Sequence, residues 1–200
     1  CGRELNFSSE IDLMFAYPEV GQTGGGERSI SNEEFFTRLA RRFIDVISKS
    51  TADGFVFRVD TRLRPYGDSG PLVMSFDAME NYYQMFGREW ERYALVKARI
   101  IAGEKNRGEA FLQRLRPFVY RRYLDYGTFE SIRDMKRKIV REVARKGLHN
   151  NIKHGYGGIR EIEFFGHVFQ LIRGGIDPNY QARSILRVLR VMNRDRCISR

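Results

Sequence analysis

The sequence predicts an α+β fold: a small mixed sheet packed with helices, followed by an all-helical subdomain. Two apolar runs rich in β-branched and aromatic residues, 11–17 and 55–60, are typical of short buried strands. An amphipathic segment lies between them, and the apolar patterns after Ser75 have the period of helices. This change of period predicts two domains, residues 1–86 with the sheet and residues 87–200 with helices alone.

The first predicted domain alternates strand, helix and strand. Ser31 and Glu34 have the capping-box spacing that marks the start of a helix. The second strand is expected to end at Asp60. Residues 65–71 combine prolines, glycines and an aspartate, which favour a turn, so we expect residues 72–74 to form a short return strand.

The second predicted domain contains helices separated by glycines and one proline. Pro117 is expected to stop one helix, because proline lacks the N–H that an interior turn needs. Gly147 is expected to cap the long basic helix before it. The helices expected after Ser75 cover residues 76–86, 89–102, 107–116, 128–146, 159–172 and 182–192.

Composition limits the class of protein. The chain has 200 residues, enough for one sizeable domain or for a domain with part of a second. With 42% hydrophobic and 30% charged residues it is expected to be globular, and no apolar run reaches the roughly 18 residues that span a bilayer. The chain opens without Met or a leader pattern, which we interpret as a fragment. Two cysteines near opposite ends predict no disulfide framework and favour a cytoplasmic protein.

The net charge of +10 has two interpretations. It fits a protein that handles phosphates or nucleic acid, and it also fits a fragment that lacks acidic partner segments. The basic residues are spread along the chain, without a basic tail or an arginine-rich repeat. We therefore expect no nucleic acid and no membrane among the partners.

Three carboxylates indicate a metal site. Glu10 and Asp12 are two residues apart at the start of the first strand, so their side chains share one face. Two such carboxylates repel each other unless a cation lies between them, and Mg²⁺ prefers oxygen ligands of this kind. If the two strands are neighbours, Asp60 completes a three-carboxylate site suited to displacement at phosphorus. We predict all three as metal ligands and catalytic residues.

Two arginines follow the third carboxylate at the same spacing. Arg62 and Arg64 can both face the metal, and guanidinium groups bind phosphate oxygens in a bidentate way. The alternative is that they form salt bridges with nearby acids such as Asp68. Ser8 and Ser9 either contact phosphate or cap the turn that begins near Gly2.

These residues resemble a known family of enzymes. Residues 2–13, Gly-Arg-Glu-Leu-Asn-Phe-Ser-Ser-Glu-Ile-Asp-Leu, resemble the opening of the DNA polymerase β-type nucleotidyltransferase superfamily. The closest resemblance is to the glutamine synthetase adenylyltransferase family, in order along nearly the whole chain. The other matching segments are 58–65 (Arg-Val-Asp-Thr-Arg-Leu-Arg-Pro), 70–73, 90–94 (Trp-Glu-Arg-Tyr-Ala), 96–99, 157–164 (Gly-Gly-Ile-Arg-Glu-Ile-Glu-Phe) and 168–171.

The resemblance implies a polymerase β-like catalytic core in residues 1–86 and a specific reaction. That family has two homologous halves with opposite activities. The sequences of segments 90–94 and 96–99 resemble more closely the half that removes AMP from a tyrosine of glutamine synthetase. Removal uses inorganic phosphate and releases ADP. The implied cofactor is Mg²⁺, and the implied partners are adenylylated glutamine synthetase, nucleotide and the nitrogen-signalling protein PII. Gly2, Ser8, Ser9, Arg62 and Arg64 are the implied phosphate and nucleotide ligands.

Two departures from the family pattern bear on activity. Glu10 stands where the family has Asp, and the extra methylene moves the carboxylate by about 1.5 Å. We expect a weakened site rather than an absent one. Cys1 stands where the family has the first of two glycines.

Four residues of the helical part are weaker candidates for the cleft: Lys153, Arg160, Glu161 and Glu163. Glu161 and Glu163 are two apart on a predicted helix, so they do not share a face and make a poor metal clamp. One is expected to reach the cleft while the other pairs with Arg160 or another base, and structural roles are favoured over catalytic ones. Lys153 lies beside a glycine turn, where a phosphate contact and a solvated loop both remain open.

Three rival functions remain. The first is the same chemistry run with nucleoside triphosphate: adenylylation of glutamine synthetase or uridylylation of PII. The second is a non-catalytic module that binds nucleotide or a partner protein, which Glu10 favours. The third is a nucleic-acid-binding domain, whose affinity would depend steeply on salt.

Overall fold

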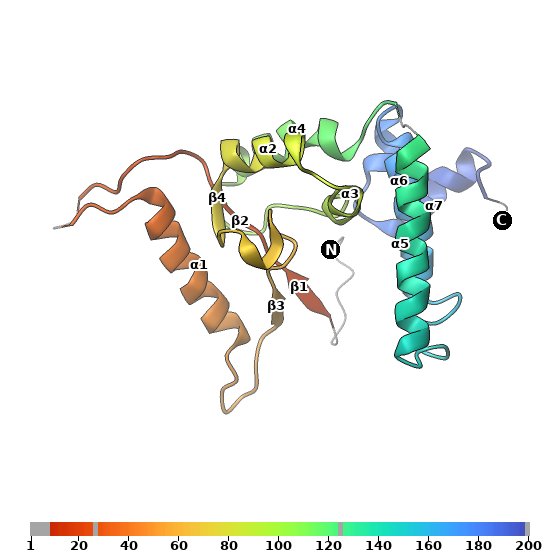
Figure 1. The fold of residues 1–200 in the computed structure, drawn as a ribbon, viewed down its shortest axis with the longest axis horizontal. Helices are drawn as coiled ribbons and strands as arrows, with labels where there is room; N and C mark the ends of the chain where they lie inside the picture. The colour runs from red at the N-terminus through yellow and green to blue at the C-terminus, as the bar shows by residue number, and fades with distance from the viewer. Residues whose placement is uncertain (1–8, 26–27, 124–125, 199–200) are drawn as a thin grey trace. The chain divides into compact units, whose positions relative to one another are not determined.

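The computed structural model describes residues 9–25, 28–123 and 126–198, which form two compact units (Figure 1). One unit contains the described residues up to Phe86 together with Asn106–Phe111. The other contains Gly87–Lys105 and the described residues from Leu112. The protein is mixed α/β, with two small strand pairs in the first unit and helices in the second. We call them the strand unit and the helical unit.

The first predicted strand is two strands with different partners. Strand β1 (Glu10–Asp12) pairs in parallel with β3 (Arg58–Asp60), and β2 (Phe15–Tyr17) pairs in parallel with β4 (Val73–Ser75). Leu13 still donates its N–H to the Asp60 carbonyl at 2.8 Å before the chain changes partner. The alternation pattern could not reveal this change, because apolar residues continue through it.

The predicted return strand is wrong in direction and partner. Strand β4 lies where expected, but it pairs with β2 in parallel rather than folding back on β3. Both described strand pairs are parallel, whereas the sequence predicted a mixed sheet. The reason is the 3₁₀ turn η1 (Gly67–Ser69), which leads the chain away from β3 toward β2 instead of closing a hairpin.

Helix α1 (Asn32–Ser48) covers the β2–β4 pair (Figure 1). It starts where the capping box predicts, since the Ser31 hydroxyl accepts the Glu34 N–H at 3.1 Å. The core beneath it consists of Tyr17, Ala40 and Val73. The Tyr17 ring stacks on Phe36 with centroids 5.5 Å apart, which anchors the helix over the strands.

The predicted boundaries fail at two helices. Helix α3 (Glu89–Leu95) is much shorter than expected: it ends in a tighter turn in which the Ala98 N–H donates to the Leu95 carbonyl at 2.9 Å, three residues back rather than four. Helix α4 (Lys105–Val119) continues past Pro117. A proline in the final turn removes only one hydrogen bond, so the helix tolerates it there. Helix α2 (Phe76–Met85) agrees with its prediction and is capped by Ser75.

The helical unit is completed by three longer helices and the 3₁₀ turn η2 (Pro178–Gln181). Helix α5 (Tyr126–Arg145) ends in the predicted glycine cap. Gly147 has φ +63°, and Leu148 donates its N–H to the Val143 carbonyl at 3.0 Å, as in a Schellman motif.

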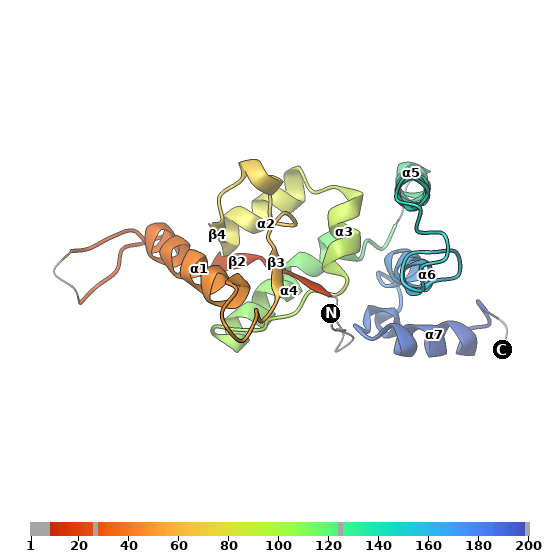
Figure 2. The ribbon, with the colours of Figure 1, turned by 90° about the horizontal axis from the view of Figure 1, so that it is seen from below.

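Helices α6 (Ile159–Arg173) and α7 (Ile185–Arg194) pack on each other (Figure 2). Gly166 permits this approach, because a Cβ there would lie 2.2 Å from the Ile185 methyl group. The core around α7 consists of Tyr180, Val188, Val191 and Met192. Among the described residues, none of the helices has the length and apolar character required to cross a membrane.

Candidate active site

Strand pairing brings the three predicted carboxylates to one face of the β1–β3 pair. Strands β1 and β3 lie side by side (Figure 1), and their register places Asp12 directly opposite Asp60 and Glu10 opposite Arg58. Residues opposite each other on neighbouring strands point the same way, as do residues two apart on one strand. The condition set by the sequence, that the two strands be neighbours, is therefore met. This face, which we call the carboxylate face, carries Glu10, Asp12, Arg58 and Asp60.

The Asp60 carboxylate is held by Arg62. The Arg62 Nε lies 3.0 Å from Oδ1 and 2.9 Å from Oδ2, its Nη2 also contacts Oδ2, and its backbone N–H donates to Oδ1 at 2.8 Å. These hydrogen bonds, above all those from the side chain, lower the pKa of the Asp60 carboxyl below its ordinary value. Asp60 is consequently an anion at neutral pH.

Glu10 has a looser arginine partner. The Arg58 Nε lies 3.7 Å from the Glu10 Oε1, and both side chains are more than half exposed. Arg58 is absent from the residues predicted from sequence, although the alternation that selects Arg62 would also have selected it. The face thus carries two arginines beside its three carboxylates.

The carboxylates of Glu10, Asp12 and Asp60 are suitable ligands for a hard divalent cation, and the strand register puts their backbone positions on one face. Carboxylate oxygens on adjacent parallel strands are ligands that Mg²⁺ takes in phosphate-handling sites. As the side chains stand, however, no three His, Cys, Asp or Glu within residues 9–25, 28–123 and 126–198 are grouped so as to hold a metal ion. The arrangement is a set of potential ligands in which Asp60 and Glu10 are engaged by arginines.

Arg64 organises the loop that follows the site. Its Nη1 donates to the carbonyl and the hydroxyl of Thr61, each at 2.9 Å. Its Nε reaches the Gly70 carbonyl at 3.3 Å, and its Nη1 lies 3.7 Å from the Asp68 carboxylate, the acid named in the salt-bridge alternative. The Arg64 side chain is only 12% exposed. Its role as a phosphate ligand stays a prediction.

The predicted serine and glycine ligands are only partly described. Ser9 directly precedes β1 and is half-buried. Gly2 and Ser8 lie outside the described residues.

The weaker candidates all belong to the helical unit, where two of them pair with lysines. Glu161 contacts the Lys136 ammonium group and accepts the Gly157 N–H at 2.7 Å, so it joins α5 to the glycine turn before α6. The Glu163 carboxylate lies 2.7 Å from the Lys97 Nζ. As expected for residues two apart on a helix, the two carboxylates have different partners.

The Lys97 side chain, which pairs with Glu163, is only 17% exposed. Lys153 is half-buried beside the turn, and Arg160 is exposed at the start of α6. Their part in a cleft stays a prediction.

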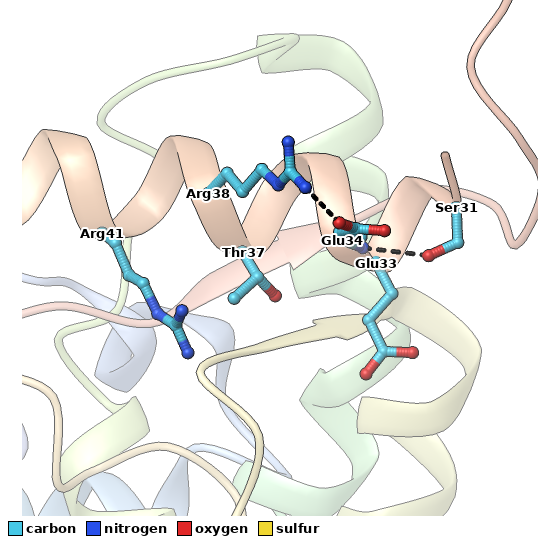
Figure 3. A pocket seen from close by; sticks show the side chains of 6 residues that line it. All are labelled: Ser31, Glu33, Glu34, Thr37, Arg38 and Arg41. Atoms are coloured by element: carbon cyan, nitrogen blue, oxygen red, sulfur yellow. Dashed lines mark hydrogen bonds and ion pairs between the residues drawn. The ribbon is translucent and has the colours of Figure 1, made fainter. Parts of the chain in front are cut away.

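A shallow hollow of about 430 Å³ lies on the first turns of α1 (Figure 3). Arg38 points toward Glu34 there, and the Ser31 hydroxyl accepts the Glu34 N–H. None of the three predicted metal ligands lines it. Its six lining residues are Ser31, Glu33, Glu34, Thr37, Arg38 and Arg41. The hollow belongs to the surface of one helix and is not part of the candidate site.

Comparison with known families decides where the chain belongs. The family described as glutamate-ammonia ligase adenylyltransferase matches residues 1–114, which include β1, β3 and the whole carboxylate face. The chain belongs to this family. A second family, GlnD PII-uridylyltransferase, matches residues 133–200, most of the helical unit.

Relatives of the glutamate-ammonia ligase adenylyltransferase family are closely similar over nearly the whole chain. Proteins of Nitrosococcus oceani and Mannheimia haemolytica are 61% and 60% identical over 95% and 94% of the chain. One from Thioalkalivibrio sulfidiphilus is 58% identical over 94%. All three are named bifunctional glutamine synthetase adenylyltransferase/adenylyl-removing enzyme. The chain spans about a fifth of their length (20%, 20% and 19%).

Proposed function

We propose that the chain is the nucleotidyltransferase core of an adenylyl-removing enzyme, with a polymerase β-like fold. The reaction is Mg²⁺-dependent phosphorolysis of the tyrosyl-AMP on glutamine synthetase, which releases ADP. The observation that supports it best is the register of β1 and β3, which sets Asp12 opposite Asp60 and Glu10 on the same face. The names of the close relatives agree with this class of reaction.

The reaction is one displacement at phosphorus. An oxygen of inorganic phosphate forms a bond to the α-phosphorus of the tyrosyl-AMP, and the bond from that phosphorus to the tyrosine oxygen breaks. The tyrosine oxygen takes up a proton, and AMP joined to phosphate leaves as ADP. The energetic difficulty is the negative charge gathered on the two phosphates, so the protein's main task is to position and neutralise them.

The residues of the carboxylate face divide this task. Glu10, Asp12 and Asp60 would hold Mg²⁺, which supplies positive charge for the transferring phosphoryl group. Arg62, whose side chain is 70% exposed, would bind the attacking phosphate. Arg64 keeps the loop after β3 in shape through its bonds to Thr61 and Gly70. Ser9, directly before β1, would contact the nucleotide phosphates.

Adenylylated glutamine synthetase is the proposed protein substrate, and PII is the proposed regulator. The reaction then places the chain in the control of nitrogen assimilation. Both partners are proposed from the resemblance to the family. The chain spans about a fifth of the length of its relatives.

A second candidate function uses the same chemistry in the opposite sense. The match of residues 133–200 to a PII-uridylyltransferase family favours a transferase that consumes a nucleoside triphosphate, with PII or glutamine synthetase as the acceptor. This function predicts pyrophosphate release and no need for inorganic phosphate. A third candidate, a non-catalytic nucleotide- or partner-binding module, is favoured by Glu10 in the place of aspartate.

The test is ADP release from adenylylated glutamine synthetase. The chain is incubated with this substrate, Mg²⁺ and phosphate, beside a folded Asp12→Asn control, in which the side chain keeps its shape and loses its charge. We expect ADP that depends on phosphate and disappears in the control. Turnover of ATP or UTP without phosphate would instead establish the second candidate.

Glu10→Asp separates a weakened site from a non-catalytic one. The shorter side chain restores the family's ligand length, and we expect a faster reaction, by up to about 10²-fold, because catalysis is sensitive to shifts of about 1 Å. If both the wild-type chain and Glu10→Asp are folded, bind Mg²⁺ and release no ADP, the non-catalytic module is the better description.

A further inference from the structure

The two arginines after β3 differ in how firmly the structure holds them. Arg64 donates to three residues of its own loop, Thr61, Asp68 and Gly70, and is nearly buried. The Arg62 side chain is 70% exposed, and within the described part of the chain its guanidinium donates hydrogen bonds to Asp60. Arg62 can therefore change partner without unpacking the loop, whereas Arg64 cannot.

Arg62 occupies the carboxylate oxygens of Asp60 that a metal ion would need as ligands. Its guanidinium contacts both oxygens of Asp60, and with Arg62 in place the Asp60 side chain is only 15% exposed. A carboxylate oxygen so engaged cannot also coordinate Mg²⁺ in full, because guanidinium and metal compete for the same lone pairs. The Glu10–Arg58 contact is weaker competition, since its 3.7 Å separation is too long for a hydrogen bond.

We propose that Arg62 is an internal counter-ion, which neutralises Asp60 until a divalent cation displaces it and then binds the phosphate substrate. The proposal rests on the proposed function and adds an order of binding to it. Displacement from Asp60 leaves the guanidinium with unused N–H donors. Two of them can donate in parallel to two phosphate oxygens. The metal and the phosphate then favour each other's binding through Arg62, beyond any direct contact between them.

Two consequences for binding follow. Without phosphate, the metal binds against the competition of Arg62, so removing Arg62 strengthens metal binding. With phosphate, the freed guanidinium has a new partner in the wild-type chain, so phosphate strengthens metal binding there and does so less in the variant. Reciprocal coupling of this kind is required of any linked pair of ligands.

The experiment measures Mn²⁺ binding by the loss of the free-ion EPR signal, with the full chain and no protein substrate. We compare the wild-type chain with Arg62→Gln, with and without inorganic phosphate. For Arg62→Gln we expect roughly tenfold tighter Mn²⁺ binding without phosphate, the size of one charge-assisted hydrogen bond. We also expect phosphate to strengthen Mn²⁺ binding in the wild-type chain and much less in Arg62→Gln.

Two control variants make the result specific. Arg38→Gln removes the same charge from an exposed ion pair on α1 and should leave Mn²⁺ affinity unchanged. Asp12→Asn should weaken Mn²⁺ binding, which assigns the measured site to the carboxylate face. Equal Mn²⁺ affinity in the wild-type chain and Arg62→Gln would overturn the counter-ion role, as would an equal gain in Arg38→Gln.

The same titration distinguishes this inference from the proposed function. Failure of the counter-ion role alone leaves Mn²⁺ binding that Asp12→Asn weakens, and the metal site of the proposed function stands. Absence of Mn²⁺ binding in the wild-type chain and in Arg62→Gln overturns both.

Discussion

At the scale of single residues, Arg92 is the clearest case of a charge used for structure. It is completely buried, and its guanidinium donates to the Val119 carbonyl at 3.2 and 3.1 Å, at the end of α4. It also lies 2.5 Å from Glu89, which Arg121 contacts from the other side at 3.1 Å. Arg92 thus forms a staple between α3 and the end of α4.

Arg92→Met should destabilise the protein by about 3 kcal/mol. The substitution keeps the apolar stem but leaves the Val119 carbonyl buried without this donor, and one-sided removal of a buried charge is costly. The measurement is urea unfolding followed by circular dichroism. The control is Arg133→Met on α5, an exposed ion pair with Glu130, which should cost less than about 1 kcal/mol. Equal losses in the two variants would contradict the staple.

At the scale of elements, the loop between β3 and β4 depends on one glycine. A Cβ on Gly70 would lie 2.1 Å from the Pro65 carbonyl oxygen, a backbone atom that cannot move aside cheaply. The Gly70 carbonyl also accepts the Arg64 Nε. Close packing of the loop on itself therefore supports the end of the carboxylate face.

Gly70→Ala should cost about 1–3 kcal/mol of unfolding free energy, the range for overpacking a filled space. It should also weaken Mn²⁺ binding, because the loop starts one residue after Asp60. Thermal unfolding and the Mn²⁺ titration measure the two effects. Gly24→Ala is the matched control, since a Cβ at Gly24 meets nothing within 4 Å. A Gly70→Ala protein as stable as this control would refute the close approach.

The joint between α5 and α6 should depend on pH. Hydrogen bonds from Lys136, and then from the Gly157 N–H, lower the pKa of the Glu161 carboxyl in the folded chain. A lowered folded pKa means that the contribution to stability is complete above the ordinary carboxyl pKa. It is lost as pH falls through the lower folded pKa.

Glu161→Gln should therefore reduce the drop in unfolding free energy between pH 6 and about pH 3. Urea unfolding at several pH values gives the comparison. Glu130→Gln, on the exposed side of α5, is expected to keep the wild-type pH profile. A Glu161→Gln profile that coincides with the wild-type profile would mean that this joint does not contribute.

At the scale of the whole molecule, many of the bases behind the net charge of +10 lie in local ion pairs. The basic helix α5 illustrates this, because four bases on it or directly after it have an acid within about one turn. The pairs are Arg133–Glu130, Arg137–Asp134, Arg145–Glu142 and Lys146–Glu142. Such a helix offers phosphate groups less free positive charge than its composition indicates.

We expect weak binding to nucleic acid. A 20-base-pair duplex should bind with a Kd no tighter than about 10⁻⁶ M at physiological salt, the range of non-specific contacts. Fluorescence anisotropy at several salt concentrations measures both the affinity and its salt dependence. Nanomolar binding with sequence preference would return the nucleic-acid-binding function to consideration.

Sequence patterns predicted the features that depend only on residues near one another in the chain. The capping box at Ser31 and the glycine cap at Gly147 lie where expected, because each needs only neighbouring residues. The alternation in β1 and β3 likewise placed Glu10, Asp12 and Asp60 on common faces. Family membership also followed from the sequence, since it is carried by ordered segments rather than by geometry.

Strand partners and side-chain partners were decided by the tertiary structure. The sequence cannot say that β2 pairs with β4 while β1 pairs with β3, because apolar residues run through the break at Leu13. The sequence also cannot say that Arg62 forms its hydrogen bonds with Asp60 while Arg64 forms them with its own loop. Both outcomes depend on which groups folding brings within reach, and hydrogen bonds and ion pairs form over only a few ångströms.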